Sequence, residues 1–352
     1  MNKEQEDNLR VSIIIPTLNR SDHVIKMLRY FDSVGFDGHV LIGDSSNEHH
    51  VEKTRKFIAG LDGRIKITYR EYPGKKNFEC IRVLLSEVDT PYVLWMCDDD
   101  ILIPATLKKC ARYLHDNPEY SAVGGVAYIY TLKGKGAFGE VKHIGRYRVD
   151  QIDGEKPSER LAKLLGYYSV VGYSLCRTKQ FKRKFIFEGF EKLTDIAIAG
   201  ELLPTCMCAV QGKVKMLDAL FVLRQDHDER YLLPGFMDRI TKPDWSISFS
   251  IFMDRLAVEM SETEKITIDS AKSAVKNALH IYLTKQFDEG MAAKSSGNFK
   301  ILLSKSARFL KKAVNYVRRK RSDPMNMLLS KDCSYREDFI GVYNIITGSN
   351  KR

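Results

Sequence analysis

The chain lacks the cysteine pattern of a disulfide framework or a cysteine-bound zinc site. Its seven cysteines are odd in number, and no two of them form a C-x-x-C pair. Cys206 and Cys208 are closer together than zinc-ribbon ligands usually are, and they lie in an apolar stretch, so we expect both in the core. The cysteines therefore indicate an intracellular protein whose thiols stay reduced.

Long apolar runs are also missing. No stretch reaches the roughly 20 residues that a membrane-spanning helix needs, and the charged start of the chain has no signal-peptide core. Internal repeats and low-complexity tracts are absent as well. With 352 residues, the chain is long enough for a large core and two lobes. We expect a cytoplasmic protein that either stays in solution or attaches peripherally to the inner face of a membrane.

Three consecutive aspartates, Asp98, Asp99 and Asp100, directly follow the apolar run 92–96. Such a run is typical of a buried central strand. Carboxylates crowded at a strand end repel one another unless a cation neutralises them, and Mg²⁺ or Mn²⁺ prefers such oxygen ligands. A helix cap is the alternative, but one aspartate is enough for a cap. The cluster therefore favours a metal site.

Strands and helices alternate on both sides of this cluster. The expected strands are 11–16, 39–43, 65–69, 92–96, 120–130 and 214–223; the expected helices are 21–31, 50–60, 77–87 and 105–117, with a loop or hairpin over 131–148. Alternation of this kind implies right-handed parallel crossovers, and ligands of such sheets bind beyond the carboxyl ends of the strands. Pro16, Thr17, Asp44 and the three aspartates all fall at that edge. The position indicates a nucleoside-diphosphate site.

Three segments in this order resemble the family 2 glycosyltransferases of the GT-A fold. They are 11–20 (VSIIIPTLNR), 40–46 (VLIGDSS) and 90–104 (TPYVLWMCDDDILIP). The resemblance covers residues 1–125. It implies an α/β fold with a mixed, mostly parallel sheet flanked by helices. It also implies an inverting, metal-dependent transferase of the hexosyltransferase type, which moves a sugar from a nucleoside-diphosphate sugar to a hydroxyl of a glycan, a lipid-linked acceptor or a polysaccharide precursor.

The resemblance also implies roles for single residues. The positions expected to bind the donor nucleotide are Pro16, Thr17, Asn19, Arg20, Asp44 and Asp98. Among these, Asp44 would accept a hydrogen bond from the base, and Asp98 would lie near the ribose. Asp99 and Asp100 would hold the Mn²⁺ or Mg²⁺ ion that bridges the diphosphate. Many family members carry Asp-x-Asp-Asp, and Cys97 stands here at the first position, so the division of roles among the three aspartates stays open.

An inverting transfer also needs a base that removes a proton from the acceptor hydroxyl. In the family this acid begins a helix that closes over the sugar, shortly before a glycine. Counting back from Gly212 gives Glu201, with Pro204 in the first turn of a helix that begins there. Asp195 has the look of a helix cap, although a helix from that point would contain Pro204 and kink. Both residues remain candidates, with Asp195 slightly favoured because the shorter side chain is usual in the class.

Basic residues follow the last expected strand. In the family this corner often supplies cations to the leaving diphosphate, where they neutralise developing charge. Arg224 and His227 are therefore candidates for contacts with the leaving group. A solvated surface loop explains them about as well.

The C-terminal third differs in composition, and we divide the chain into a GT-A domain, 1–235, and a helical, basic region, 236–352. From 241 onward the chain has 20 lysines and arginines against 12 aspartates and glutamates. The segment 299–321 predicts a basic amphipathic helix, which either binds an anionic membrane surface or packs on the body. No motif for specific nucleic-acid recognition accompanies the charge.

Two other functions remain as alternatives. One is a non-catalytic relative that binds membranes or polyanions with the same fold. The other is a sugar nucleotidyltransferase, but such enzymes typically carry a glycine-rich N-terminal loop, which residues 16–20 do not resemble.

Overall fold

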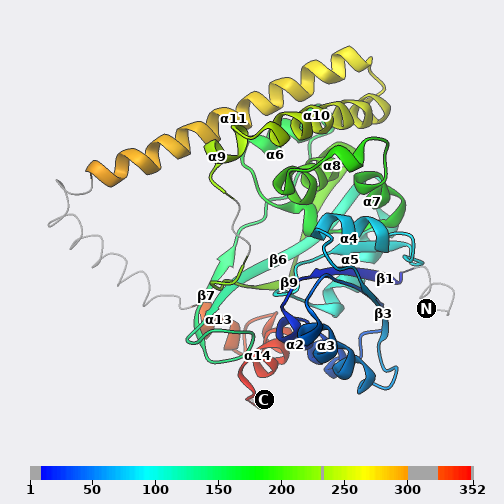
Figure 1. Ribbon diagram of the computed structural model, residues 1–352, viewed down its shortest axis with the longest axis vertical. Coiled ribbons are helices and arrows are strands. Elements are labelled where there is room, and N and C mark those ends of the chain that lie inside the picture. Colours follow the sequence, from blue (N-terminus) through cyan, green and yellow to red (C-terminus); the bar gives the residue numbers. More distant parts are fainter. Residues whose placement is uncertain (1–8, 231–233, 300–323, 350–352) are drawn as a thin grey trace.

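Nine strands of the described residues form one mixed sheet through the centre of the protein (Figure 1). The structure is a computed structural model that describes residues 9–230, 234–299 and 324–349. The strand order is β3-β2-β1-β4-β8-β6-β9-β5, and β7 pairs with β6. The strands are β1 Val11–Thr17, β2 His39–Asp44, β3 Lys66–Glu71, β4 Tyr92–Trp95, β5 Ile101–Leu102, β6 Tyr120–Leu132, β7 Val141–Tyr147, β8 Leu175–Arg177 and β9 Lys213–Gln225.

The parallel half of the sheet places the predicted residues at one edge. β1 pairs in parallel with β2 and with β4, and β2 pairs in parallel with β3. Beyond β4 the direction changes, because β8 is antiparallel to both β4 and β6. Thr17, Asp44 and the residues after Trp95 therefore leave the sheet on the same side, as the sequence predicts.

Alternate residues of β1 face two cores. Ile13 and Ile15 pack in the core beneath α2, whereas Ile14 packs in the core that includes α4, α8 and α10. The helices around the sheet are α2 Ser21–Ser33, α3 Glu48–Ala59, α4 Asn77–Leu84, α5 Pro104–Asp116, α6 Pro157–Gly166, α7 Thr178–Phe185, α8 Leu203–Gln211, α10 Pro243–Glu264 and α11 Ile268–Phe299. Burial of β1 on both faces explains its continuous apolar run.

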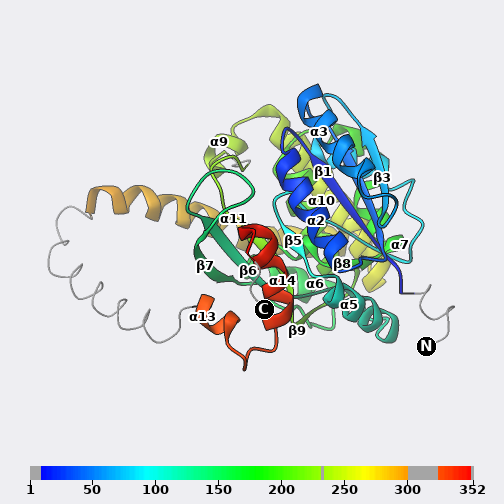
Figure 2. The same cartoon turned by 90° about the horizontal axis from the view of Figure 1, so that it is seen from below.

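The C-terminal helices pack on this body at two places. α10 and α11 lie over α6 and α8 in the upper layer of Figure 1. Phe252 and Leu256 of α10 and Leu279 of α11 are buried in the same core as Ile14. α13 (Pro324–Leu329) and α14 (Arg336–Thr347) form the second place, where α14 lies beside α2 in both views (Figures 1 and 2). The division at 235 stays a prediction.

Most elements predicted from the sequence are confirmed, with ends that differ by one to three residues. Residues 131–148 contain the turn of a hairpin, since β7 pairs antiparallel with β6. Cys206 and Cys208 are fully buried, as predicted. The predicted basic helix over 299–321 lies outside the described residues, apart from Phe299 at the end of α11. None of the helices that the structure describes has the apolar length needed to cross a bilayer.

Candidate active site

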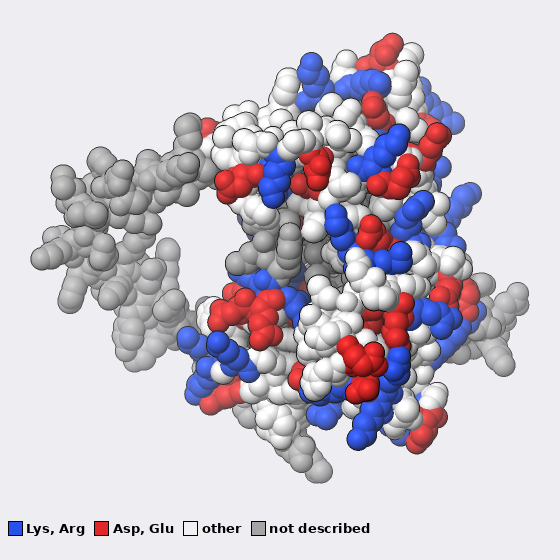
Figure 3. Space-filling model, viewed as in Figure 1, with Lys and Arg blue, Asp and Glu red and all other residues white. Residues whose placement is uncertain are grey.

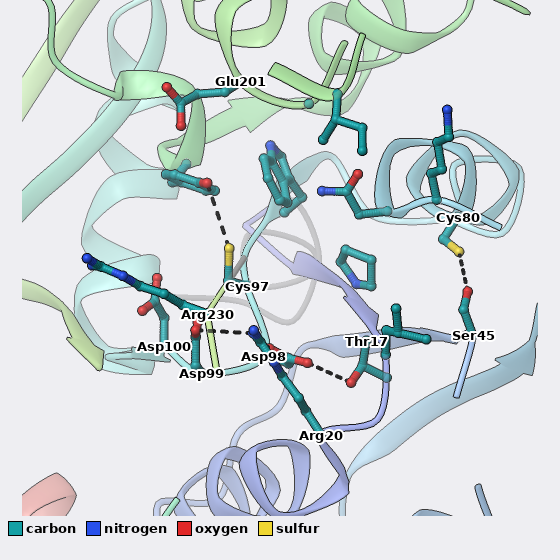
Figure 4. A pocket seen from close by; sticks show the side chains of 18 of the residues that line it. Thr17, Arg20, Ser45, Cys80, Cys97, Asp98, Asp99, Asp100, Glu201 and Arg230 are labelled. Carbon is teal, nitrogen blue, oxygen red and sulfur yellow. Dashed lines mark hydrogen bonds and ion pairs between the residues drawn. The ribbon is translucent and has the colours of Figure 1, made fainter. Parts of the chain in front are cut away.

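A cavity of about 990 Å³ opens at the sheet edge where β1 and β4 end. A cavity of this volume is typical of a small-molecule site. Predicted site residues that line it are Pro16, Thr17, Asn19, Arg20, Asp98, Asp99, Asp100, Glu201 and Arg224. Figure 4 shows the three aspartates on one side of the cavity and Glu201 on the other, with Cys97 between them. The cavity therefore brings an acidic cluster and an isolated acid together across one space.

The turn after β1 closes over the acidic cluster. Asn19 has a left-handed backbone, with φ of 55°, which asparagine tolerates better than most residues. This turn allows Arg20 to reach back, and its Nη1 lies 3.1 Å from Asp98 Oδ1 and 3.4 Å from Asp99 Oδ2. Thr17 Oγ1 donates to Asp98 Oδ2 over 2.7 Å. Thr17 at the end of β1 and Arg20 in the turn after it thus hold the aspartates that follow β4.

The strand end of β9 approaches the cluster from the other side. Arg224 Nε donates to Asp100 Oδ2 over 3.1 Å, and His227 Nε2 lies 2.9 Å from Asp99 Oδ2. Both candidates from the basic corner therefore contact the aspartates rather than open solvent. Arg224 lines the cavity, whereas His227 is not among the lining residues and stacks on His23, with ring centroids 4.7 Å apart.

A buried lysine lies beneath the same cluster. Lys26 Nζ, on α2, donates to the Asp99 carbonyl over 2.9 Å and to Gln225 Oε1 over 2.6 Å, and its side chain is fully buried. With Arg20 and Arg224, it offsets the repulsion among the three carboxylates. Protein cations therefore supply part of the neutralisation that the sequence assigned to a metal alone.

Burial and pairing give the three aspartates different acidities. Burial and the neighbouring Asp99 charge raise the pKa of Asp98 to about 6. Burial also raises the pKa of Asp100 to about 7, against the effect of Arg224. Burial opposes the charge of Asp99 too, but the His227 hydrogen bond and Arg20 hold its pKa below the ordinary value. Asp99 is the carboxylate that stays ionised most readily.

The donor atoms at the cluster fit a hard divalent cation. Ligand atoms of Cys97, Asp99 and Asp100 lie within 4.8 Å of one another. Two carboxylates are suitable for Mg²⁺ or Mn²⁺, which prefer oxygen. Burial raises the pKa of Cys97 well above its ordinary value, so this residue offers a thiol rather than the thiolate that soft metals select. Cys97 is half-buried and lines the cavity instead of being fully buried.

Asp44 holds the loop after β2 rather than lining the cavity. Its Oδ2 accepts from the Tyr69 hydroxyl over 2.6 Å, and its Oδ1 accepts from the Ser46 backbone N–H over 2.8 Å. Only 1% of its surface is exposed. The next residue, Ser45, lines the cavity, where it is labelled in Figure 4.

The two candidate bases occupy different positions on one helical segment. Asp195 Oδ1 accepts from the Ile198 N–H over 2.9 Å, which is the geometry of an N-cap, and Asp195 is not among the residues that line the cavity. A π-helical segment, Ile198–Leu202, then leads into α8, and Pro204 lies in the first turn of α8. The wider π turn accommodates the proline, which lacks an N–H. Glu201 lies in this segment and faces the cavity.

Burial and one hydrogen bond define the environment of Glu201. Burial raises the pKa of its carboxyl above the ordinary value, and the Tyr168 hydroxyl, which donates to Oε1 over 3.1 Å, acts in the opposite direction. Tyr168 packs against Tyr282 of α11, with ring centroids 5.4 Å apart. A half-buried carboxylate with a raised pKa that faces a cavity has the properties of a general base.

Several residues of the site could not be predicted from the sequence. Tyr147 and Tyr173 both line the cavity, and the Arg224 guanidinium lies 4.8 Å and 5.2 Å from their ring centroids. The hairpin and a short 3-10 turn bring these rings together, and neither has a motif. Lys26 carried a weak signal, because the apolar residues Val24, Met27 and Leu28 lie close to it in the same helix.

Comparison with known proteins agrees with the fold. Residues 12–166 match the model of the family described as glycosyl transferase family 2. The structure of S. aureus TarS 1–349 in complex with UDP-GlcNAc is similar with a TM-score of 0.50 and 14% identity, over 85% of this chain and 77% of that one. A longer S. aureus TarS structure is similar with a TM-score of 0.49 and 15% identity, over 85% of this chain and 46% of that one. The chain thus spans less than half of that longer structure.

A mannosyltransferase is similar at a lower level. PcManGT from Pyrobaculum calidifontis, in complex with GDP-Man and Mn²⁺, gives a TM-score of 0.44 and 13% identity, over 95% of this chain and 85% of that one. The match to TarS 1–349 shows the fold alone, which is the GT-A fold that the sequence predicts.

Proposed function

We propose that this chain, whose residues 12–166 match the model of glycosyl transferase family 2, moves a sugar from a nucleoside-diphosphate sugar to a hydroxyl acceptor with inversion. The observation that carries the proposal is the placement of Asp98–Asp100 and Glu201 on opposite sides of one cavity. Inversion requires attack from the face opposite the leaving group. A base and a diphosphate-binding cluster on opposite sides of one cavity meet that requirement.

The donor's nucleotide would lie along the carboxyl ends of β1 and β2. Pro16, Thr17 and Asn19 form that wall, and Ser45 continues it. Asp44 acts there by fixing the loop after β2, so in our proposal it shapes the base pocket through Ser45 instead of bonding the base itself. UDP-GlcNAc is the first donor to try, because TarS 1–349 was solved with it.

The diphosphate end of the donor would lie over the acidic cluster. Asp99 and Asp100 would hold Mn²⁺ or Mg²⁺, and a divalent ion there neutralises charge on the leaving diphosphate. Arg20 and Arg224 already face these carboxylates, so donor phosphates can take the two guanidinium groups as partners. Asp98, which Thr17 and Arg20 hold, would lie near the ribose.

Glu201 would take the proton from the acceptor hydroxyl. It faces the cavity, burial raises its pKa, and Tyr168 fixes one of its oxygens. Asp195 would instead begin the helix that carries Glu201. Of the two candidates, we therefore propose Glu201 as the base and Asp195 as the cap.

The test is binding of UDP measured by calorimetry with and without Mn²⁺. We expect Mn²⁺ to strengthen UDP binding, and we expect Asp99→Asn to abolish that effect while leaving the melting temperature within a few degrees. Asp116→Asn, at the exposed end of α5, is the matched control and should bind as the native chain does. Equal binding by Asp99→Asn and the native chain would remove the metal from the proposal.

The acceptor and its location form a separate part of the proposal. A glycan or lipid-linked acceptor would bind on the Glu201 side, and the segment 299–321 would bring the enzyme to an anionic membrane surface. On the face seen in Figure 3, basic and acidic side chains of the described residues are interspersed. Cosedimentation with anionic vesicles at low salt tests this part; a chain that stays in the supernatant contradicts it.

A further inference from the structure

Two cysteines and a lysine meet in the core, away from the residues that line the cavity. Lys184 Nζ, in the last turn of α7, lies 2.9 Å from Cys208 Sγ of α8 and 3.1 Å from Cys176 Sγ of β8. All three residues have no exposed surface. Three separate elements of the fold thus converge on one ammonium group.

The partners of Lys184 are unusual for a buried cation. Buried lysines are normally paired with a carboxylate, because an isolated charge in the core is costly. In the part of the chain that the structure describes, the hydrogen-bond partners of Nζ are the two sulfurs, and the Phe181 ring lies 5.1 Å away. The charge of Lys184 is therefore balanced if one sulfur is a thiolate.

Cys208 is the sulfur that meets this need. Its Sγ is the closer of the two to Nζ. Its contact with the Val171 carbonyl, at 3.8 Å, is also longer than the 3.4 Å contact of Cys176 Sγ with the Ser174 carbonyl. The hydrogen bond from Cys176, followed by the Lys184 charge, lowers the pKa of Cys208 to about 6, although burial opposes this. The pKa of Cys176 is raised well above its ordinary value, first by its hydrogen bond to Cys208.

The geometry points to a redox-active thiol site, and we propose that hydrogen peroxide converts Cys176 and Cys208 into a disulfide with Lys184 as the proton carrier. A thiolate with a neighbouring thiol is the arrangement in which a sulfenic acid is resolved to a disulfide. This site is separate from the proposed transfer reaction and does not depend on it.

The first step oxidises Cys208. Its thiolate attacks one oxygen of the peroxide, the O–O bond breaks, and Cys208 becomes a sulfenic acid. The hydroxide that leaves takes a proton from Lys184 and becomes water. Lys184 is then a neutral amine between the sulfenic acid and the Cys176 thiol.

The second step forms the S–S bond. Lys184 takes the Cys176 proton, the new thiolate attacks Cys208 Sγ, and the S–O bond breaks. The departing hydroxide takes this proton from Lys184 and becomes a second water. In total, two sulfur groups lose two electrons to one peroxide, which yields two waters.

The thiol site lies next to the backbone that leads to one residue of the cavity wall. Cys208 Sγ lies 3.8 Å from the Val171 carbonyl, and Val170, the next residue along the chain, lines the cavity. In our proposal, a small oxidant that enters the cavity reaches the thiol site through this part of the wall.

The experiment treats the full chain with hydrogen peroxide, blocks the remaining thiols with N-ethylmaleimide and identifies the peptides by mass spectrometry. We expect the peptides of Cys176 and Cys208 to be joined with the loss of two hydrogens, and dithiothreitol to separate them. Cys110 is an internal control, because it is equally buried and burial raises its pKa despite the charge of Lys109. Cys208 should react at least about tenfold faster than Cys110.

Two variants assign the roles. Lys184→Met should slow the reaction of Cys208 to the rate of Cys110, because it removes the cation. Since that variant can fail to fold, Cys176→Ser provides a second test. In this variant the oxidation should stop at a sulfenic acid on Cys208, which dimedone traps. Equal rates for Cys208 and Cys110 in the native chain, or a disulfide from Cys208 to another cysteine, would overturn the proposal.

Discussion

At the scale of single residues, Glu201 and Asp195 differ in what their carboxylates contact. Glu201 faces the cavity and accepts one hydrogen bond from a tyrosine, whereas Asp195 holds a backbone N–H. A base needs a carboxylate free to accept a proton from the substrate, and a cap needs one that stays bonded to the helix. The two residues should therefore respond differently to removal of their charge.

The first prediction separates them by mutation. Glu201→Gln should lower turnover by about 10²–10⁴-fold with donor affinity preserved, because the amide cannot take the acceptor proton. Asp195→Ala should lower the free energy of unfolding by about 1 kcal/mol with a smaller change in turnover, because it removes a cap. Steady-state kinetics and thermal unfolding check both. Full turnover in Glu201→Gln would remove Glu201 as the base.

The second prediction concerns the pH profile of Tyr168→Phe. As the proposed base, Glu201 would act when ionised, so turnover should fall as the pH drops through its pKa, which burial raises. The Tyr168 hydrogen bond lowers that pKa, and its removal should therefore move the acidic limb of the kcat profile to higher pH. A purely structural role for Tyr168 would instead lower kcat equally at every pH.

Site residues that directly follow one strand could be predicted from the local sequence alone. The run Asp98–Asp100 after an apolar strand gave the acidic cluster, and Pro16 and Thr17 followed from the same edge. Lys26 and Tyr168 could not be predicted in this way. Lys26 and Asp99, which form a hydrogen bond, are 73 residues apart in the sequence, and Tyr168 and Glu201 are 33 residues apart. Their roles therefore arise only when the chain folds and brings these elements together.

At the scale of elements, close pairing of β6 with β9 fixes the strand that carries Arg224. This pairing is parallel and has register shifts near Gly125. A Cβ at Gly125 would lie 2.5 Å from the Ala219 carbonyl oxygen of β9, which is closer than any real contact. The sequence predicted both strands, but it could not predict these shifts, because they depend on which residues meet across the pair.

The third prediction follows from that contact. Gly125→Ala should lower the free energy of unfolding by about 1–3 kcal/mol, because one strand must move away from the other. Gly134→Ala, where a Cβ meets nothing within 4 Å, is the matched control and should be nearly neutral. Urea unfolding of both variants measures the difference in the free energy of unfolding. Equal stability of the two variants would contradict the close packing of β6 against β9 at Gly125.

At the scale of the whole molecule, the C-terminal helices share a core with the sheet. Phe252 and Leu256 of α10 pack in the same cluster as Ile14 of β1, and Tyr282 of α11 supports Tyr168. A change of composition near residue 235 suggested a division there. The distribution of charged residues indicates which face of a helix is exposed, but it does not indicate what the apolar face packs against. The shared core therefore could not be predicted from the sequence.

The fourth prediction uses the chain's two tryptophans, Trp95 on β4 and Trp245 on α10. Each single-tryptophan variant, Trp95→Phe and Trp245→Phe, reports unfolding of a different part by fluorescence. A shared core should give each variant one transition, whose midpoint by fluorescence coincides with its midpoint by circular dichroism. Separate transitions would indicate two independent domains divided near 235.

The central claim is that one cavity binds a nucleotide sugar and releases its diphosphate with help from the acidic cluster. Its most direct test is release of nucleoside diphosphate from a panel of nucleotide sugars that begins with UDP-GlcNAc, in the presence of Mn²⁺. We predict release from at least one donor by the native chain and by Asp116→Asn, and release at background by Asp99→Asn. Absence of release from every donor, with and without candidate acceptors, or equal release by Asp99→Asn, would contradict the account.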